Sequence, residues 1–284
     1  MMPSLPDMTT PNVEALAADA RAPRPDPAET VPELKPALFE GLCRLGDSTL
    51  VLGHRLSEWC GKGPALEEDI ALANIALDLI GHTQMWLGLA AEVEEAGRSA
   101  DDLAYLRDAM RFRNLLLVEL PNGDMARTLM RQFLFDAWHH EMLERLTGSD
   151  SARVAEIAVK ALKEVRYHLE RSSDLVIRLG DGTAESHRRM AGALDMLWPY
   201  TGEMFAGDGT DAALAEAGIA PDPASLHEAW HGIVTEVLEE ATLGVPEGRA
   251  DVQKGGRQGR HTEHLGYLLA EMQFLQRAYP GAEW

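Results

Sequence analysis

The chain has 284 residues, of which 45% are hydrophobic, so it can bury a substantial core and is not intrinsically disordered overall. Acidic residues outnumber basic ones by 46 to 26, a formal net charge of -20 that disfavours binding to nucleic acid or to an anionic membrane. Two cysteines are too few for a disulfide framework, and no secretory signal or bilayer-length apolar run is visible, so we expect a cytoplasmic protein without nucleic-acid or membrane partners.

The first 34 residues are rich in proline, which recurs from Pro3 to Pro32 among small and acidic residues. Prolines at this density break helices, and such a stretch has little apolar surface to bury. We therefore expect residues 1–34 to form a flexible proline-rich tail, with at most a brief helix over 13–21. Residues 35–284 are expected to form one helical domain.

Beyond residue 35, apolar residues recur at steps of three and four, the spacing that places side chains on one face of an α-helix. The first run passes through Leu42, Leu52 and Trp59 and ends before Pro64, and the second extends from Leu66 to Leu87. Further helices are expected over 102–119, 124–146, 151–179, 183–207, 211–217, after 223 and over 263–279, with a glycine-rich basic loop at 244–259. No stretch shows the alternation of a strand, so the sequence predicts an all-α helical bundle.

A helical bundle can hold a pair of metal ions in its core, with one Glu from each of two helices and Glu-x-x-His from each of two others. Three residues are nearly one helical turn, so both side chains of such a motif reach the same ion. The sequence offers fragments of this pattern, and Glu-x-x-His is nowhere intact in the relevant helices. The acids and histidines at the corresponding places are Asp47, Asp78, Asp136, His139, Glu164 and His168.

The histidines depart from the pattern by one residue in two helices. His82 follows Asp78, and His168 follows Glu164, by four residues instead of three. One residue turns a side chain by about a hundred degrees around the helix, so neither histidine can simply stand in as a ligand without a movement of its helix. We therefore interpret the candidate residues as a vestigial centre that binds no metal.

A vestigial centre leaves buried carboxylates that need partners, because an unpaired buried charge costs several kcal/mol or changes its protonation. Lys160 lies one turn before Glu164, so its ammonium is a candidate substitute for the charge of the metal. The alternative is an active di-metal centre with an irregular ligand set, built from Asp136, His139, Glu164 and His168.

The segment from Lys254 to His261 concentrates positive charge in an acidic chain. Lys254, Arg257 and Arg260 are candidates for contacts with a partner protein or with the phosphates of a coenzyme A ligand. The segment lacks the strand–loop–helix context of a nucleotide-phosphate motif, so a solvated loop is the alternative. His261 and His264 have no third metal ligand in view, and we expect them to cap and pack the last helix.

Strings spread from about residue 38 to residue 284 carry a family resemblance. They read RLGD at 44–47, LSEWCG at 56–61, LANIALDL at 72–79, FRNLLLVE at 112–119, DAWH at 136–139, KEVRYHL at 163–169, HTEHLG at 261–266 and AEMQ at 270–273. With these strings the chain resembles the C-subunit family of the bacterial phenylacetyl-CoA epoxidase, the ring 1,2-monooxygenase of phenylacetate degradation.

The resemblance implies a ferritin-like helical bundle with additional C-terminal helices. It also implies a place in an enzyme that adds one oxygen atom of O2 to the aromatic ring of phenylacetyl-CoA. In that enzyme the catalytic A subunit has the di-iron site, electrons come from NADPH through a reductase, and a small bridging B subunit joins the A–C pairs. The C subunit resembles a copy of A that has lost its ligands, so the resemblance implies a non-catalytic structural partner that binds no cofactor itself.

Three functions therefore compete on the sequence alone. A structural subunit should expose apolar surface and self-associate, as a dimer, when isolated. A di-metal oxygenase in its own right requires its ligands to converge on bound metal at about two ångström. A module that binds coenzyme A esters would use the basic loop, and binding of coenzyme A by the isolated chain would favour it.

Overall fold

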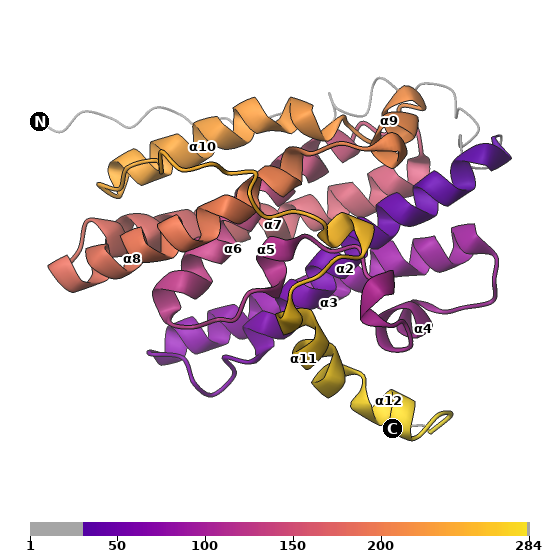
Figure 1. Ribbon diagram of the computed structural model, residues 1–284, viewed down its shortest axis with the longest axis horizontal. Coiled ribbons are helices and arrows are strands. Elements are labelled where there is room, and N and C mark those ends of the chain that lie inside the picture. Colours follow the sequence, from indigo (N-terminus) through magenta and orange to yellow (C-terminus); the bar gives the residue numbers. More distant parts are fainter. Residues whose placement is uncertain (1–30, 283–284) are drawn as a thin grey trace, which may run out of the picture.

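The structure is a computed structural model that describes residues 31–282. These residues are helical almost throughout, and no strand is found among them (Figure 1). The expected all-α fold is therefore confirmed. The expected proline-rich tail lies outside the described residues except for its last four positions, where a 3-10 turn, η2 (Pro32–Leu34), leads into the first long helix.

Both long and short helices occur along the described part of the chain. The α-helices are α2 (Lys35–Ser57), α3 (Leu66–Glu94), α4 (Ala100–Tyr105), α5 (Leu116–Glu119), α6 (Met125–Leu146), α7 (Ala152–Gly180), α8 (Ala184–Leu197), α9 (Gly209–Glu216), α10 (His227–Glu240), α11 (Glu263–Met272) and α12 (Phe274–Ala278). The remaining 3-10 turns are η3 (Ala109–Arg111), η4 (Trp198–Phe205), η5 (Pro223–Leu226) and η6 (Gly256–Gln258).

The four longest helices, α2, α3, α6 and α7, form the central bundle (Figure 1). α2 packs along α3, and α6 packs along α7, while α8 and α10 cover α6 and α7. Fully buried side chains from each helix fill the space between them, among them Leu52, Ile75, Phe133 and Val165. Burial of such side chains contributes roughly 1.5–3 kcal/mol each, so this shared core stabilises the bundle and fixes its central helices.

Local signals in the sequence explain where two of the long helices begin. The Asp124 carboxylate accepts the backbone N–H of Arg127 at the start of α6, and Thr183 and Ser186 cap each other's backbone at the start of α8. Each cap satisfies N–H groups that have no partner within the helix. The expected starts near residues 124 and 183 are therefore confirmed.

The expected helix over 102–119 is wrong, because the chain there is broken into α4, η3 and α5. Side chains from distant elements take the backbone N–H groups that a continuous helix would use. Asp47 accepts from Arg113 N at 2.8 Å, and Glu203 accepts from Leu116 N at 2.8 Å. Farther along, Pro199 lacks an N–H group, and α8 gives way to the 3-10 turn η4 where a continuous helix to 207 was expected.

Within the described part of the chain, none of the helices combines the length and the apolarity that crossing a bilayer requires. The last helices, α11 and α12, project from the body of the bundle (Figure 1).

Candidate functional site

Three histidines meet in the interior between α3, α6 and α7. His82, His139 and His168 are fully buried. The ring centroids of His82 and His139 lie 5.8 Å apart, and those of His82 and His168 lie 6.4 Å apart. The interpretation that the one-residue slip prevents His82 and His168 from simply standing in as metal ligands stays a prediction. The orientation of α3 and α7 turns the histidines inward and leaves their acids at the edge.

Two hydrogen bonds join these histidines to carboxylates on the facing helix. His82 Nε2 lies 2.6 Å from Glu164 Oε2, and His168 Nε2 lies 3.0 Å from Asp78 Oδ2. The carboxylate side chains are 40% and 35% exposed respectively, so they reach the histidines from the rim of the interior. Asp78, His82, Glu164 and His168 therefore form a histidine–carboxylate seam that ties α3 to α7.

Ion pairs continue this seam toward both ends of the two helices. Arg171 on α7 pairs with Glu68 near the start of α3, and Arg153 near the start of α7 pairs with Glu92 near the end of α3, at 3.0 Å. α3 and α7 are antiparallel, so these two ion pairs flank the histidine–carboxylate bonds on either side. The contact between α3 and α7 therefore carries polar side-chain pairs at several points along its length.

Asp136, three residues before His139 on α6, is a fully buried carboxylate of this interior. Its Oδ1 accepts from Gln132 Nε2 at 2.7 Å, and its Oδ2 lies 2.9 Å from the hydroxyl of Ser172. Neither partner carries a charge. Burial accordingly raises the pKa of Asp136 to about 7, although nearby His168 and the two hydrogen bonds oppose the rise.

His139 is the least satisfied polar side chain of the interior. Neither of its ring nitrogens finds a hydrogen-bond partner among the described residues, and its ring packs 5.1 Å from that of Phe135. Burial lowers the pKa of His139 well below its usual value, and burial likewise lowers the pKa of His82. The Nδ1 atoms of His82 and His168 also lack a partner within the described range. Burial therefore disfavours the charged form of His82 and of His139.

Asp47, the candidate on α2, lies in a separate buried cluster. Its carboxylate forms an ion pair with the Arg107 guanidinium, with Nη1 at 3.1 Å from Oδ2, and also accepts the backbone N–H of Arg113. These donors neutralise the charge of Asp47 and occupy its oxygens. The structure therefore does not bring Asp47 together with the other candidates.

The prediction that Lys160 replaces the charge of a metal is wrong. Lys160 is exposed on α7, whereas His82 and His168 are fully buried. The reason is helical periodicity: Glu164 itself lies at the rim, so a residue one turn before it on the same face faces solvent. Glu164 is hydrogen-bonded to His82 instead.

The interior residues do not fit a di-iron pair. Such a centre takes four carboxylates and two histidines. This interior offers three histidines and one buried carboxylate, Asp136, while Asp78 and Glu164 at the rim are hydrogen-bonded to histidines and Asp47 is bonded to Arg107. No three of the interior side chains bring ligand atoms within 4.8 Å of one another in the described structure. The charge and the geometry both disagree with a two-metal site.

Comparison with known proteins gives the chain a family. Residues 20–284 match the family described as "Phenylacetic acid catabolic protein" (PaaA_PaaC). The chain belongs to this family. The family is ferritin-like, in agreement with the helical bundle. The chain is also similar to a protein of Escherichia coli (strain K12) that is named as the C subunit of 1,2-phenylacetyl-CoA epoxidase, with 51% identity over 241 residues, which cover 85% of this chain and 96% of that protein.

One group of potential metal ligands was missed by the sequence reasoning. His140, Glu141 and Glu144 on α6 place ligand atoms within 4.8 Å of one another. His140 Nδ1 lies 3.2 Å from Glu141 Oε1, and Arg145 lies within ion-pair distance of the same acid. Glu144 is exposed, and groups of this kind are common on protein surfaces without an ion, so this group does not identify a metal centre.

The basic segment is docked onto the bundle by a buried acid. Glu203 Oε1 accepts the backbone N–H groups of Gly255 and Gly256 at 2.7 and 2.8 Å. A Cβ atom on Gly256 would collide with the carbonyl oxygen of Asn114, so glycine is needed for this close approach. The alternative of a solvated loop is therefore wrong for the residues around Gly256.

The three basic candidates of this segment have different environments. Arg257 is buried, and its guanidinium bonds Asp211 and the carbonyl of Ala206 at 2.7 Å. Lys254 and Arg260 are exposed. A contact with a partner or with coenzyme A phosphates therefore remains a prediction for Lys254 and Arg260, whereas Arg257 has an internal structural role.

His261 packs at the start of the last helices, as expected. Its Nδ1 lies 2.5 Å from Glu119 Oε1, and its Nε2 lies 3.0 Å from the carbonyl oxygen of Phe112. The other oxygen of Glu119 accepts from both the backbone and the hydroxyl of Thr262. His264 is half-buried, and its carbonyl accepts from Arg55 at 3.2 Å.

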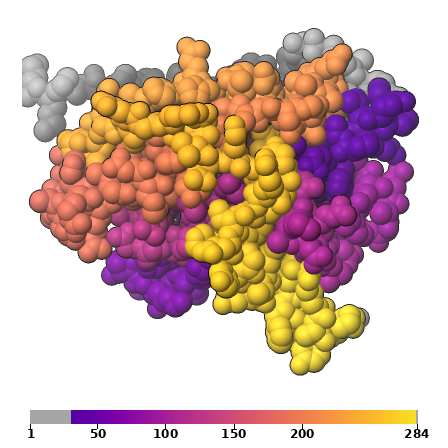
Figure 2. Space-filling model, in the orientation of Figure 1, coloured from indigo at the N-terminus to yellow at the C-terminus, as the bar shows by residue number. Residues whose placement is uncertain are grey.

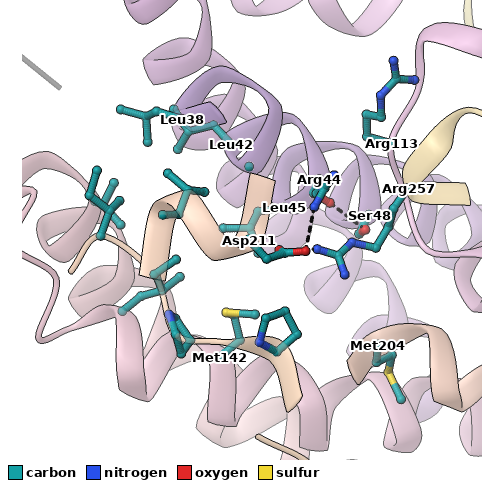
Figure 3. A pocket seen from close by; sticks show the side chains of 18 of the residues that line it. Leu38, Leu42, Arg44, Leu45, Ser48, Arg113, Met142, Met204, Asp211 and Arg257 are labelled. Carbon is teal, nitrogen blue, oxygen red and sulfur yellow. Dashed lines mark hydrogen bonds and ion pairs between the residues drawn. The ribbon is translucent and has the colours of Figure 1, made fainter. Parts of the chain in front are cut away.

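A small cavity of about 60 Å³ lies beside α2, α6 and α9 (Figure 3). Apolar side chains including Leu42, Met142 and Met204 line it, and Arg44 and Asp211 lie at its wall. Arg44 bonds Asp211 at 3.0 Å and also pairs with Asp208. Although partial burial opposes the shift, this guanidinium lowers the pKa of Asp208. Arg44 and the two aspartates at the cavity wall are therefore paired with one another. Arg44 lies far from both aspartates in the sequence, so no local motif predicts these pairs.

Proposed function

We propose that this chain is a non-catalytic structural subunit of a multicomponent 1,2-phenylacetyl-CoA epoxidase in phenylacetate catabolism, where it pairs with and stabilises a di-iron catalytic subunit. One observation carries the proposal: a chain of this family places three buried histidines and one buried carboxylate where a ferritin-like bundle would hold a metal pair. The extensive similarity to the C subunit of an epoxidase supports the same assignment.

The proposal distributes the chemistry over several chains. This chain binds no cofactor, the catalytic A subunit holds the di-iron site, and electrons arrive from NADPH through a reductase. A small bridging B subunit joins the pairs of A and C. The complex acts in the cytoplasm, and the isolated chain covers its exposed apolar surface by self-association, as a dimer.

Co-expression with the cognate catalytic subunit tests the proposal. The two chains should elute together in size-exclusion chromatography. With the reductase and the B subunit added, oxygenation of phenylacetyl-CoA should require both the catalytic chain and this one, and this chain alone should be inactive. Product formation by this chain without the catalytic subunit, or elution of the two chains as separate species, would overturn the proposal.

A matched variant separates a structural role from a hidden catalytic one. His139→Leu removes the ring that is central to the interior while retaining apolar volume. A structural subunit with this substitution should still support the full activity of the complex. Loss of activity in a complex that remains assembled would instead indicate that the interior takes part in chemistry.

A further inference from the structure

The C-terminal arm, which consists of α11 and α12 (residues 263–278), extends away from the rest of the molecule. Figure 2 shows it as a protruding ridge beside the compact helical body. The inner face of α11 is buried through Leu265, Leu268 and Leu269, whereas α12 buries none of its residues. α12 therefore needs either firm anchoring or a partner to remain ordered.

Two side chains anchor the arm to the segment between α4 and η3. Gln273 is buried, and its Nε2 donates to the carbonyl oxygens of Ala104 and Arg107, both at 3.0 Å. Arg277 Nη2 donates to the carbonyl oxygen of Arg107 and to Asp108 Oδ1, both at 2.9 Å. These bonds fix the orientation of the arm in the free chain. Its outer face is therefore pre-organised, which lowers the entropic cost of docking a partner.

The anchored arm presents large apolar side chains to solvent. Tyr267 and Phe274 are 70% and 60% exposed, and Leu275 and Tyr279 are also exposed. Each aromatic side chain can bury about 150–250 Å², and exposed apolar patches of a few hundred Å² commonly mark interaction sites. Aromatic residues are also enriched in protein–protein interfaces. The arm therefore has the composition of an interface.

A groove runs along the arm beside these side chains. Its volume is about 520 Å³, and its walls come from the arm and from Asp108 and Ala109. Gly266, Ala270 and Ala278, which recur along one side of the arm, also line it. Small residues at such positions let another backbone approach closely, so the groove suits an α-helix laid along the arm.

Charge distinguishes between the candidate occupants of the groove. A second copy of this chain would bring a further formal charge of -20 to an equally acidic surface. Near the groove, Arg277 is paired with Asp108, and Glu263 and Glu271 on the arm are exposed. The arm's own charges outside the Arg277–Asp108 pair are therefore acidic, and they favour a different chain whose helix carries apolar residues flanked by lysine or arginine.

We infer that the C-terminal arm is the docking element for a basic-flanked amphipathic helix of the catalytic partner subunit, and this inference rests on the proposed function. Tyr267 and Phe274 insert between side chains of that helix, and the groove beside Ala270 receives its ridge. Gln273 acts as a positioning residue, because it holds the arm in the binding orientation without reaching its outer face.

The double substitution Tyr267→Ser and Phe274→Ser tests this inference, with affinity for the catalytic subunit measured by interferometry on the full chain. We expect binding to weaken about a hundredfold, because buried aromatic side chains are typical interface hot spots. Both side chains are exposed, so the melting temperature should stay unchanged. Leu77→Ser, which removes a side chain 66% exposed on α3, is the matched control and should bind as the wild type does.

The outcomes separate the inference from the function on which it rests. Wild-type affinity in the double variant would overturn the docking role of the arm and leave the proposed function standing, whereas failure of the wild-type chain to bind would refute the function itself. If the double substitution abolishes self-association of the isolated chain but leaves affinity for the catalytic subunit intact, the arm serves a second copy and the inference is wrong.

Discussion

Two buried regions of this molecule treat their polar groups in opposite ways. Around Asp47, Glu119 and Glu203, every buried carboxylate is met by several donors, including the Arg107 guanidinium, the His261 ring and backbone N–H groups. Between α3, α6 and α7, His139 has no partner among the described residues, and Asp136 has only neutral ones.

The polar groups of the first region hold the fold together, whereas those of the second lie where a ferritin-like bundle would hold a metal pair. In the first region the carboxylates accept backbone N–H groups that have no partner within a helix, and they thereby anchor irregular segments. Removing one carboxylate leaves several of these donors unsatisfied. In the second, the polar atoms gain few hydrogen bonds from the protein, and burial disfavours the charged forms of Asp136, His82 and His139. The first region should therefore be sensitive to substitution and the second tolerant of it.

The largest expected effect is the removal of Asp47. Asp47→Ala leaves the Arg107 guanidinium buried without its counter-ion, and breaking a buried pair in this way costs about 3–5 kcal/mol. Chemical denaturation monitored by circular dichroism measures the loss. Asp47→Asn is the control, because its amide oxygen still accepts from Arg113 N and should preserve part of the stability. A loss no greater than that of an average surface substitution would show that the two regions do not differ as described.

The pH dependence of stability should come from the other region. The Asp136 carboxyl has a pKa of about 7 in the folded chain against an ordinary value of 3.8, so the unfolded state binds fewer protons between these values. Stability therefore falls as pH rises from about 4 to 7, by roughly 2–4 kcal/mol in total. His139 acts in the opposite sense, because its lowered pKa makes stability fall as pH drops below 6.5.

Asp136→Asn isolates the first of these two effects. The amide cannot ionise and can still bond Gln132 and Ser172, so the variant should match the wild type near pH 5 and be more stable than it near pH 8. Melting temperatures across this range provide the measurement. Parallel pH profiles for the two proteins would show that folding does not raise the pKa of Asp136.

A pair of histidine substitutions compares the two regions directly. His261→Leu removes one of the donors to the buried Glu119 carboxylate and should destabilise the chain by about 2 kcal/mol, because the bond between the imidazole and this acceptor is lost. His139→Leu replaces an unpartnered ring with an apolar side chain and should be neutral or slightly stabilising. Thermal unfolding of both variants in one buffer is sufficient. Equal losses at the two positions would contradict the comparison.

The smallest effect is expected at the rim of the seam. Glu164→Gln keeps a hydrogen-bond acceptor for His82, and Glu164 is 40% exposed. Partly exposed pairs of this kind contribute about 0–1 kcal/mol, so the free energy of unfolding should change by less than that. Denaturant titration of the variant beside Asp47→Ala gives the comparison, and a loss of similar size in both would place Glu164 among the structural anchors.

Much of the fold could be predicted because its signals are local. Helical spacing and caps such as Asp124 and Thr183 lie within a few residues of the helix starts that they determine. The break in the expected 102–119 helix could not be predicted, because Asp47 and Glu203, which take its backbone N–H groups, lie 66 and 87 residues away in the chain.

The candidate site was predictable in part for the same reason. Asp78, Asp136, His139, Glu164 and His168 do gather around one interior, since each follows helical periodicity. Spacing alone could not tell which of two neighbouring positions faces inward, because the rotation of each helix is set by packing against the others. Asp47 was wrongly predicted to lie with the other candidates, because no local sequence signal predicts its ion pair with Arg107.

The iron content of the chain tests the central claim most directly. The chain would be purified alone from iron-supplemented cells and analysed by inductively coupled plasma mass spectrometry. A structural subunit whose interior does not fit a metal pair should contain less than about a tenth of an iron per chain. A content near two irons per chain, abolished by Glu164→Ala, would contradict the account and show that this subunit has its own metal centre.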